Sequence, residues 1–466
     1  MELTIETHPR GRLFRRAQLE QPKEYRLEYL DQAALELHRA TGRGQLMQCV
    51  WVYEHPFDDA GFERFHHNLY ASLGSRLIER SPLPFGRPRW VQPVGPPPPV
   101  HIAEQSRPRS ELMDWADELC GLPIDPENGP GWHLAIQRLD DGSTAASIVA
   151  SHVIGDGVGA LMAVFEGITG NIRETGYERP RSRSRTQAIV ADLRQAVRDL
   201  PLTARTAVKA AKMVRAKRDD FARARAAHAA PVDGRHVVVP SVAVYVDIPE
   251  WDAKAEALGG NSYSLLAGFA AKLGEHFGRR RAADGTVTLM IAINLRESLD
   301  DDRALAMAFA SATVDPTKVS TDLTEARNGV RTAREKAKNE PDPTMELMPL
   351  IPWLPQGAVK GIADLLFAYS EDLPVSCSNL GDLPPDLARV DGTPADYVFI
   401  RALDTDVTIG ELQRSHGQLV VVSGRINGRV SISVEAYQLD AENSKDRLRG
   451  LVEQTLAEFG LNAVID

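Results

Sequence analysis

The chain has 466 residues, of which 43% are apolar and 25% are charged. This length predicts roughly two to three domains. Ordinary contents of aromatic residues, glycine and proline exclude collagen-like, disordered and small disulfide-scaffold proteins. A net charge of −10 argues against a surface built throughout for nucleic acid, so we expect no nucleic-acid partner.

The three cysteines, Cys49, Cys120 and Cys377, are widely spaced and include no CxxC pair. They indicate neither a disulfide framework nor a cysteine zinc site, and a reducing cytoplasm fits best. The first 16 residues contain no apolar core of a signal peptide. No stretch reaches the ~18 uncharged apolar residues that a membrane span needs. We therefore expect a cytoplasmic protein that could still contact a membrane surface peripherally.

The first part of the chain alternates strand and helix patterns. The run QLMQCVWVY at 45–53 predicts a strand, and apolar residues at helical spacing predict a helix over 61–80. Residues 82–99 are rich in proline and are expected to be extended or loop-like. Further predicted elements are a helix over 110–120, a strand over 143–151 and a helix over 158–168. An α/β domain over residues 1–172 is predicted.

A basic, alanine-rich segment follows. Residues 179–225 contain 14 Lys or Arg and 4 Asp or Glu, a net charge of +10, which leaves about −20 on the rest of the chain. We expect a helical linker over 173–235 that joins the first domain to a second at 236–466. Two interpretations of residues 179–225 stay open: a solvated connector, or peripheral contact with an anionic membrane.

The second part of the chain also has an α/β pattern. A strand is expected over 236–248, a helix over 264–277 and a strand over 286–294. Asn427-Gly428 between two alternating runs predicts a hairpin of strands 418–426 and 429–437. A closing helix is expected from its N-cap at Ser444 to Phe459.

The sequence SHVIGDG at 151–157 carries the most chemistry and has the form HxxxDG between a predicted strand and a predicted helix. A histidine at a strand end is held rigidly and titrates near neutrality, so His152 can act as a general base. Asp156 is expected to fix the turn structurally, and Gly157 to permit its tight backbone. The alternative is a core histidine before an ordinary Gly-Asp-Gly turn.

Two other interpretations of this segment are weaker. Residues 155–160 match the dinucleotide fingerprint GxGxxA, but a second buried strand should follow the helix and the sequence does not provide one. A nucleophilic triad of Ser151, His152 and Asp156 is also disfavoured, because adjacent residues on a strand point to opposite faces. His152 is therefore expected to act without a protein nucleophile.

The HxxxDG motif resembles that of the CoA-dependent acyltransferases related to chloramphenicol acetyltransferase and to peptide-synthetase condensation domains. More closely, the chain resembles the bacterial wax ester synthase/diacylglycerol acyltransferase family over about residues 27–460. The similar segments are YLDQAALELHRATGRGQLMQCVWVYE, RPRWVQPV, LPIDPENGPGW, MIAINLRES and SCSNLGDLP.

This resemblance implies an α/β (α+β sandwich) fold of two chloramphenicol-acetyltransferase-like domains that face each other across a cleft. It implies that Arg296 pairs with Asp156 and that Asn379 lies near the interdomain cleft. The alternatives are a surface arginine and a strand-end cap. The implied reaction transfers an acyl group from acyl-CoA, as a co-substrate, to an alcohol, and no other cofactor is expected.

The sequence also departs from the family. Ser151 replaces the usual first histidine of the motif, Ser262-Tyr263 replaces Asn-Asp, and residues 380–382 replace Val-Pro-Gly. These departures leave the substrate class open. The alternatives are a condensation-type catalyst that uses an acyl carrier protein, and a catalytically silent binding protein of the same fold.

Overall fold

The computed structural model describes residues 25–42, 44–216, 218, 233–340, 345–355, 358–359 and 373–466. The end of the predicted linker, from residue 219 to 232, lies outside these ranges.

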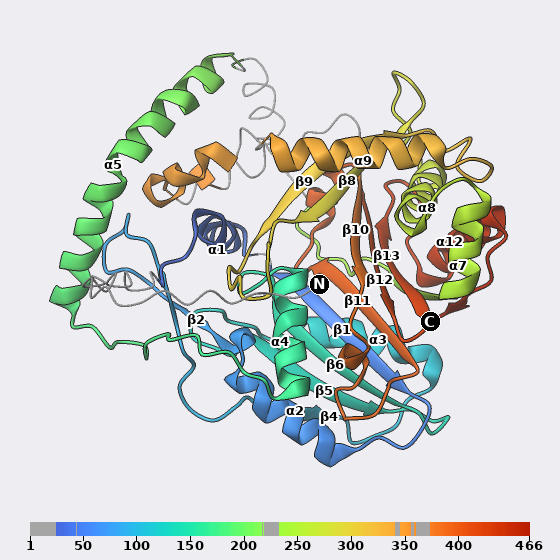
Figure 1. The fold of residues 1–466 in the computed structure, drawn as a ribbon, viewed down its shortest axis with the longest axis horizontal. Helices are drawn as coiled ribbons and strands as arrows, with labels where there is room; N and C mark the ends of the chain where they lie inside the picture. The colour runs from blue at the N-terminus through green and yellow to red at the C-terminus, as the bar shows by residue number, and fades with distance from the viewer. Residues whose placement is uncertain are drawn as a thin grey trace, which may run out of the picture.

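A five-stranded sheet forms the lower layer in Figure 1. Its strands in spatial order are β11 (Tyr397–Asp404), β1 (Gln45–Tyr53), β6 (Thr144–Ser151), β5 (Trp132–Arg138) and β4 (His101–Ile102). Helices α2 (Asp59–Ala71) and α4 (Gly157–Thr169) cover one face, and α3 (Leu112–Cys120) packs on the other. Side chains of β1 alternate between these two cores, so that Trp51 faces α2 and Val50 faces α3.

A seven-stranded sheet forms the second layer. Its strands in spatial order are β14 (Val464–Ile465), β7 (Ser241–Asp247), β13 (Arg429–Tyr437), β12 (Gln418–Ile426), β10 (Val375–Asp382), β8 (Val287–Asn294) and β9 (Met307–Val314). The helices whose buried residues share its main core are α7 (Ile248–Ala257), α8 (Ser262–His276), α9 (Thr324–Asn339) and α12 (Lys445–Phe459). This arrangement places the HxxxDG motif of the first half beside β8 and β10 of the second.

The two halves of the chain are joined through strand β11. It belongs to the second half of the sequence but pairs with β1 in antiparallel register. Phe399 of β11, Val50 of β1 and Tyr245 of β7 lie in one shared apolar core. The sheets therefore do not divide the chain at a single point near residue 236, although the mixed α/β fold class predicted from the sequence is confirmed.

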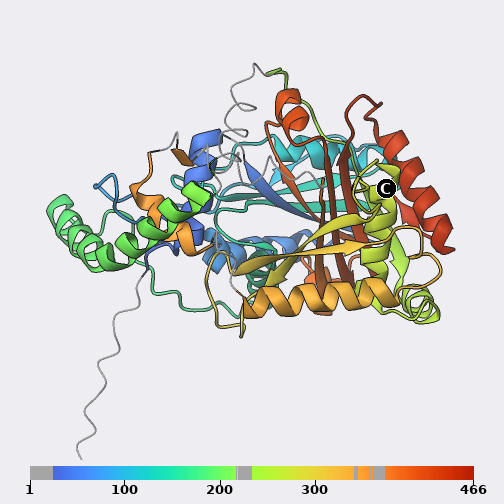
Figure 2. The ribbon, with the colours of Figure 1, turned by 90° about the horizontal axis from the view of Figure 1, so that it is seen from above.

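Three helical segments lie to one side of the sheets. They are α1 (Tyr29–Thr41), the 32-residue α5 (Arg185–Ala216) and the 3-10 helix η3 (Met345–Trp353). Helix α5 lies farthest from the sheets in both views (Figures 1 and 2). Within the residues that the structure describes, no helix is long and apolar enough to cross a bilayer.

Several predicted elements agree with the structure and two are too long. The strand predicted over 236–248 covers only Ser241–Asp247. The strand at 45–53 and the hairpin have the predicted bounds, and Asn427 and Gly428 both have positive φ, at 48° and 78°. The predicted helix over 61–80 is too long. Helix α2 ends at Ala71, where the Ser72 hydroxyl accepts from the Gly74 N–H and starts a separate 3-10 turn.

Candidate functional site

A cavity of about 130 Å³ lies between the two halves of the chain, and its walls are mostly apolar. The strands β1, β6, β8, β10 and β11 and the helix α4 all contribute side chains to it. The polar residues of its lining are Gln48, His152, Asp156, Asn294, Ser378, Asn379 and Arg401. Four of the five site residues predicted from the sequence therefore lie at this cavity, His152, Asp156, Gly157 and Asn379, and the fifth, Arg296, contacts it through Asp156.

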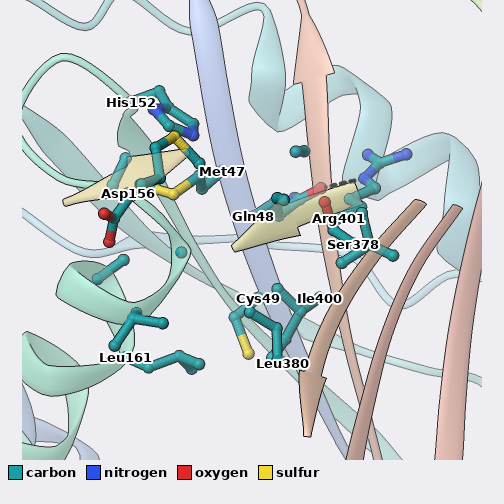
Figure 3. Close-up of a pocket in the computed structure, with 18 of the residues that line it drawn as sticks. Met47, Gln48, Cys49, His152, Asp156, Leu161, Ser378, Leu380, Ile400 and Arg401 are labelled. Carbon is teal, nitrogen blue, oxygen red and sulfur yellow. Dashed lines mark hydrogen bonds between the residues drawn. The ribbon is translucent and has the colours of Figure 1, made fainter. Parts of the chain in front are cut away.

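The backbone places His152 directly after β6. Its N–H donates to the Gln45 carbonyl at 2.8 Å, which continues the pairing of β6 with β1. The Ser151 hydroxyl accepts from the Val153 N–H at 3.2 Å and is buried, so it stabilises the turn. The imidazole of His152 is half-buried and points toward Met47 and the cavity (Figure 3).

Burial lowers the pKa of His152 below its ordinary value. The negative charges of Asp156 and Asp404 and a hydrogen bond to the backbone of His152 itself act in the opposite direction but do not outweigh burial. The imidazole is therefore neutral at pH 7, which is the form that can accept a proton.

The Asp156 carboxylate accepts hydrogen bonds from one arginine and from two backbone N–H groups. Its carboxylate accepts from Nη1 of Arg296 at 2.7 Å to both oxygens, from the Gly159 N–H at 2.8 Å and from the Ala306 N–H at 2.9 Å. Its own N–H donates to the Ala304 carbonyl at 2.9 Å. In Figure 3 its carboxylate points away from His152. Asp156 thus caps α4 and ties the motif to the second half of the chain.

Arg296 is not a surface arginine. Its side chain is 3% exposed, and its Nη2 donates to the carbonyls of Arg303 and Ala304 at 2.7 and 3.0 Å. The guanidinium therefore binds Asp156 and the chain before β9 at the same time. This pairing was expected from the resemblance alone, and the structure places the two residues together.

Gly157 and Gly159 matter because they leave room for neighbouring groups, and not because of an unusual backbone conformation. Gly157 is the first residue of α4, so it does not belong to the turn, and it does not have positive φ. A Cβ at Gly157 would lie 3.3 Å from Leu380, and one at Gly159 would lie 3.1 Å from Nη2 of Arg296. The close approach of the second half of the chain is what favours small residues here.

Arg76 is a second buried arginine of the site, and the sequence analysis did not identify it. Its Nε and Nη2 donate to the Ile154 carbonyl at 3.1 and 2.7 Å, and its Nη1 donates to the Asp302 carbonyl at 2.8 Å. The guanidinium lies 4.3 Å from the centre of the Trp90 ring. Two arginines thus hold the residues between His152 and Asp156, Arg76 through Ile154 and Arg296 through Asp156.

Asn379 lies near the end of β10 and lines the cavity. Its Oδ1 accepts from the Gly381 N–H at 2.8 Å, and Gly381 has a φ of 74°, which favours glycine. β10 continues to Asp382, so this contact lies within the strand, at the register shift after Asn379, and is not the strand-end cap of the alternative interpretation. With Oδ1 engaged, its Nδ2 group is the part left to donate.

Comparisons with solved structures identify the fold. The first condensation domain of the CDA synthetase is 13% identical, with a TM-score of 0.54 over 95% of this chain and 99% of that one. The wax ester synthase/diacylglycerol acyltransferase from Marinobacter aquaeolei VT8 is 16% identical, with a TM-score of 0.53 over 93% and 98%. The trichothecene 15-O-acetyltransferase from Fusarium sporotrichioides is 10% identical, with a TM-score of 0.53 over 93% and 94%.

The chain has the condensation-domain and acyltransferase fold. The likeness covers almost the whole length of both chains in each comparison. At 10 to 16% identity it shows the fold and not the substrate. No family model matches the sequence, and no curated protein matches it.

In this fold, β6 pairs antiparallel with both β1 and β5. The strand and helix around residues 155–160 therefore do not form the parallel unit that a dinucleotide fingerprint requires. This agrees with the rejection of that interpretation from the sequence.

Arg401 forms the polar end of the cavity wall. It donates to Oε1 of Gln48 at 2.7 Å, to Asp117 at 2.6 Å and to the Ser241 hydroxyl. Its guanidinium points away from His152 in Figure 3. This buried cation connects β11 to β1, α3 and β7, and its role is to hold the two halves together.

A second and larger cavity, of about 1140 Å³, lies between α1, α5, η3, α9 and β9. Its lining includes Met307, which also lines the His152 cavity. Apolar side chains of β9 form part of its wall, and Arg205, Lys209 and Lys338 lie among its charged residues. The two cavities are therefore neighbours. The larger one has apolar and cationic groups and also the carboxylates of Glu28, Glu340 and Glu346.

Proposed function

We propose that this protein is an acyltransferase that moves an acyl group from a CoA thioester to an alcohol hydroxyl, with His152 as the general base. The observation that carries the proposal is a neutral, half-buried imidazole that faces a largely apolar cavity formed by both halves of the chain. In such a cavity the thioester and the hydroxyl meet away from bulk water, beside one base.

The proposed reaction needs no acyl-enzyme. His152 takes the proton of the acceptor hydroxyl as the oxygen attacks the thioester carbonyl carbon. The tetrahedral intermediate then collapses, the C–S bond breaks, and the proton on His152 passes to the departing sulfur. The products are an ester and CoA thiol, and the imidazole returns to its neutral form.

Two nucleophiles near His152, Ser151 and Cys49, do not suit a covalent route. The Ser151 hydroxyl is engaged by the Val153 N–H. Burial raises the pKa of the Cys49 thiol well above its ordinary value, so Cys49 is a neutral thiol at pH 7. We therefore propose direct transfer from acyl-CoA, the co-substrate, without an acyl-enzyme.

Asn379 is proposed as a group that positions the thioester. Its Oδ1 is held by Gly381, which leaves Nδ2 to donate toward the cavity that it lines. A donor aimed at the carbonyl oxygen stabilises the charge that develops there in the transition state. Asp156 and Gly157 are proposed to act through the backbone position of His152, and Arg296 through Asp156.

In the proposed enzyme, residues 1–172 and 236–466 each contribute side chains to the site, and residues 173–235 connect these two segments. The thioester and the alcohol then approach the shared cavity from different sides. Because CoA thioesters are intracellular metabolites, the proposed place of action is the cytoplasm.

Release of CoA thiol tests the proposal. Purified protein is incubated with acyl-CoAs of increasing chain length and with a fatty alcohol, a diacylglycerol or a hydroxylated specialised metabolite. Free thiol is followed with a chromogenic reagent, and the ester is identified by mass spectrometry. We expect ester and thiol in equal amounts, and the acceptor is the alcohol that supports them.

The same experiment separates the other two functions. A carrier-protein-bound acyl donor with an amine acceptor replaces the CoA thioester and the alcohol in a parallel assay. Amide formation from the carrier protein alone would favour the condensation-type catalyst. Absence of product with every donor and acceptor, together with tight binding of one of them, would favour the silent binding protein.

A further inference from the structure

The outer face of α5 carries a row of exposed apolar side chains. They follow one another at spacings of three or four residues, so they lie on one face of the helix. The row, called here the α5 ridge, consists of Val190, Leu193, Val197, Leu200, Ala204, Val208 and Ala211. Its five valines and leucines are between 40% and 63% exposed. A ridge of this length is unusual on a surface that faces only water.

The charges of α5 are divided between its two sides. Its two acidic residues face inward: Asp192 is buried against Arg26 at 2.9 Å, and Asp199 lies 3.8 Å from Arg87. The exposed charged residues of α5 are all cations. Arg205 and Lys209 line the larger cavity, where Lys209 lies 2.7 Å from Glu346. The other exposed cations are Arg185, Arg194, Arg198, Lys212 and Arg215. On a chain with a net charge of −10, this face is locally basic.

Buried contacts on the inner face of α5 determine which way the α5 ridge faces. Ala188, Asp192 and Thr206 are buried, and Ser81 donates to Asp192 at 2.6 Å. These contacts fix the rotation of α5 about its own axis. The ridge therefore lies on the side of the helix away from these contacts. Figures 1 and 2 show α5 itself at the edge of the molecule.

We propose that the α5 ridge and its cations bind an anionic lipid surface. Apolar side chains along one face with arginine and lysine beside them are the features of a helix that lies in the membrane interface. The cations would contact lipid phosphates while the valines and leucines enter the boundary of the acyl chains. Within the described part of α5 there is no Trp or Phe, so the binding is shallow, reversible and sensitive to salt.

A second copy of the chain is a poorer partner for the same face. Two α5 ridges packed against each other by a two-fold axis would bring like residues together. Arg194, Arg198 and Lys212 of one copy would then approach the same cations of the other, which is repulsive. Charge complementarity therefore favours the anionic lipid surface.

Membrane binding through the α5 ridge does not depend on the acyltransferase chemistry. It would, however, bring the larger cavity close to lipid, because Leu202, Arg205 and Lys209 of α5 line that cavity. Failure of one proposal would leave the other standing, since one is measured by vesicle binding and the other by product formation.

Vesicle cosedimentation with the full chain tests this proposal. Vesicles of equal parts phosphatidylcholine and phosphatidylglycerol are compared with phosphatidylcholine alone, at low and high salt. The ridge variant is Leu193→Gln, Val197→Gln, Leu200→Gln, and the cation variant is Arg194→Gln, Arg198→Gln, Lys212→Gln. The matched control replaces three apolar residues elsewhere that are at least as exposed, Val94→Gln, Val238→Gln and Leu299→Gln.

We expect the wild type and the matched control to bind anionic vesicles at low salt, and the neutral vesicles at least about tenfold more weakly. The ridge and cation variants should each lose about tenfold in partitioning. Circular dichroism and thermal unfolding check that the variants fold. If the ridge variant does not fold, the partitioning of the cation variant tests the proposal.

Three outcomes would overturn the proposal. The first is absence of wild-type binding to anionic vesicles at low salt, and the second is equal binding by the wild type and both variants. The third is a dimer without lipid, seen by light scattering, that the ridge variant converts to a monomer. That result would assign the α5 ridge to a second copy of the chain.

Discussion

Arg296, just after β8, places Nη1 2.7 Å from both carboxylate oxygens of Asp156, which lies 140 residues earlier in the chain. Both side chains are almost fully buried, at 3% and 4% exposure. This ion pair fixes the start of α4 to the second half of the chain, and so it fixes the turn that carries His152. The site exists only when the two halves are packed together.

Asp156→Asn and Arg296→Ala should therefore both destabilise the protein and lower its activity. Removal of one partner leaves a buried charge without compensation, at a cost of about 3 to 5 kcal/mol in the free energy of unfolding. The double variant should lose less than the sum of the two single losses. Chemical denaturation of the four proteins measures this coupling, and strict additivity would show that the pair does not act as a unit.

The elements with strong local patterns could be predicted from the sequence. Of the contacts between the halves, the Arg296–Asp156 pair was expected only from the family resemblance, and the pairing of strands between the halves was not expected. The run at 45–53 and the Asn427-Gly428 hairpin match the structure because alternation and turn chemistry are local. The exchange of β11 into the first sheet depends on pairing with β1, some 350 residues away, which leaves no local pattern.

The candidate site shows the same division. His152 and Asp156 stand in one short motif, so the sequence indicated both. Arg76 lies between an ordinary 3-10 turn and a short strand, and only the folded chain brings it to the Ile154 carbonyl. Trp90 lies in RPRWVQPV, one of the segments that resemble the family. Nothing in that segment indicates that the Arg76 guanidinium covers the Trp90 ring.

The pH dependence of activity should show His152 as a base with a lowered pKa. Protonation removes the base, so kcat/KM should fall as the pH drops through a value below the ordinary 6.5 and stay level at neutral pH. Asp156→Asn should move this acidic limb to still lower pH, because the Asp156 charge raises the pKa of His152. A limb at or above 6.5 in the wild type would contradict the buried environment of the imidazole.

The wall of the His152 cavity should limit the length of the acyl group or the acceptor. Leu161 of α4 is buried and lines the cavity near Cys49 and Ile400. Leu161→Ala should enlarge the cavity and raise kcat/KM for longer substrates relative to shorter ones, by up to about tenfold, since each added methylene contributes about 1 kcal/mol.

A matched substitution separates cavity shape from stability in that experiment. Leu273→Ala in α8 removes a fully buried leucine from the core of the second half, away from the cavity, whereas Leu161 is 9% exposed. Both variants should lose about 2 to 5 kcal/mol in the free energy of unfolding. The preference for substrate length should change in Leu161→Ala alone. An equal change in Leu273→Ala would show that Leu161 does not limit substrate length.

His133 should make folding stability depend on pH. Burial lowers its pKa to about 4, against an ordinary value of 6.5, and its Nδ1 is buried without a partner. The unfolded state thus binds more protons than the folded state between these values, so stability is full above 6.5 and is lost as the pH falls toward 4. The loss should be about 3 kcal/mol.

Urea denaturation of the wild type and of His133→Gln at pH 7 and pH 4 isolates this contribution. The free energy of unfolding should fall between pH 7 and pH 4 by about 3 kcal/mol more in the wild type than in the variant. Parallel curves for the two proteins would show that His133 is not the group that titrates.

The most direct test of the proposed chemistry is CoA thiol release by His152→Ala under conditions where the wild type is active. A general base contributes about 100-fold to 10,000-fold, so turnover should fall by that factor while the circular dichroism spectrum and the unfolding midpoint stay near those of the wild type. A folded His152→Ala variant with near wild-type turnover would contradict the account, because the chemistry would then not depend on this imidazole.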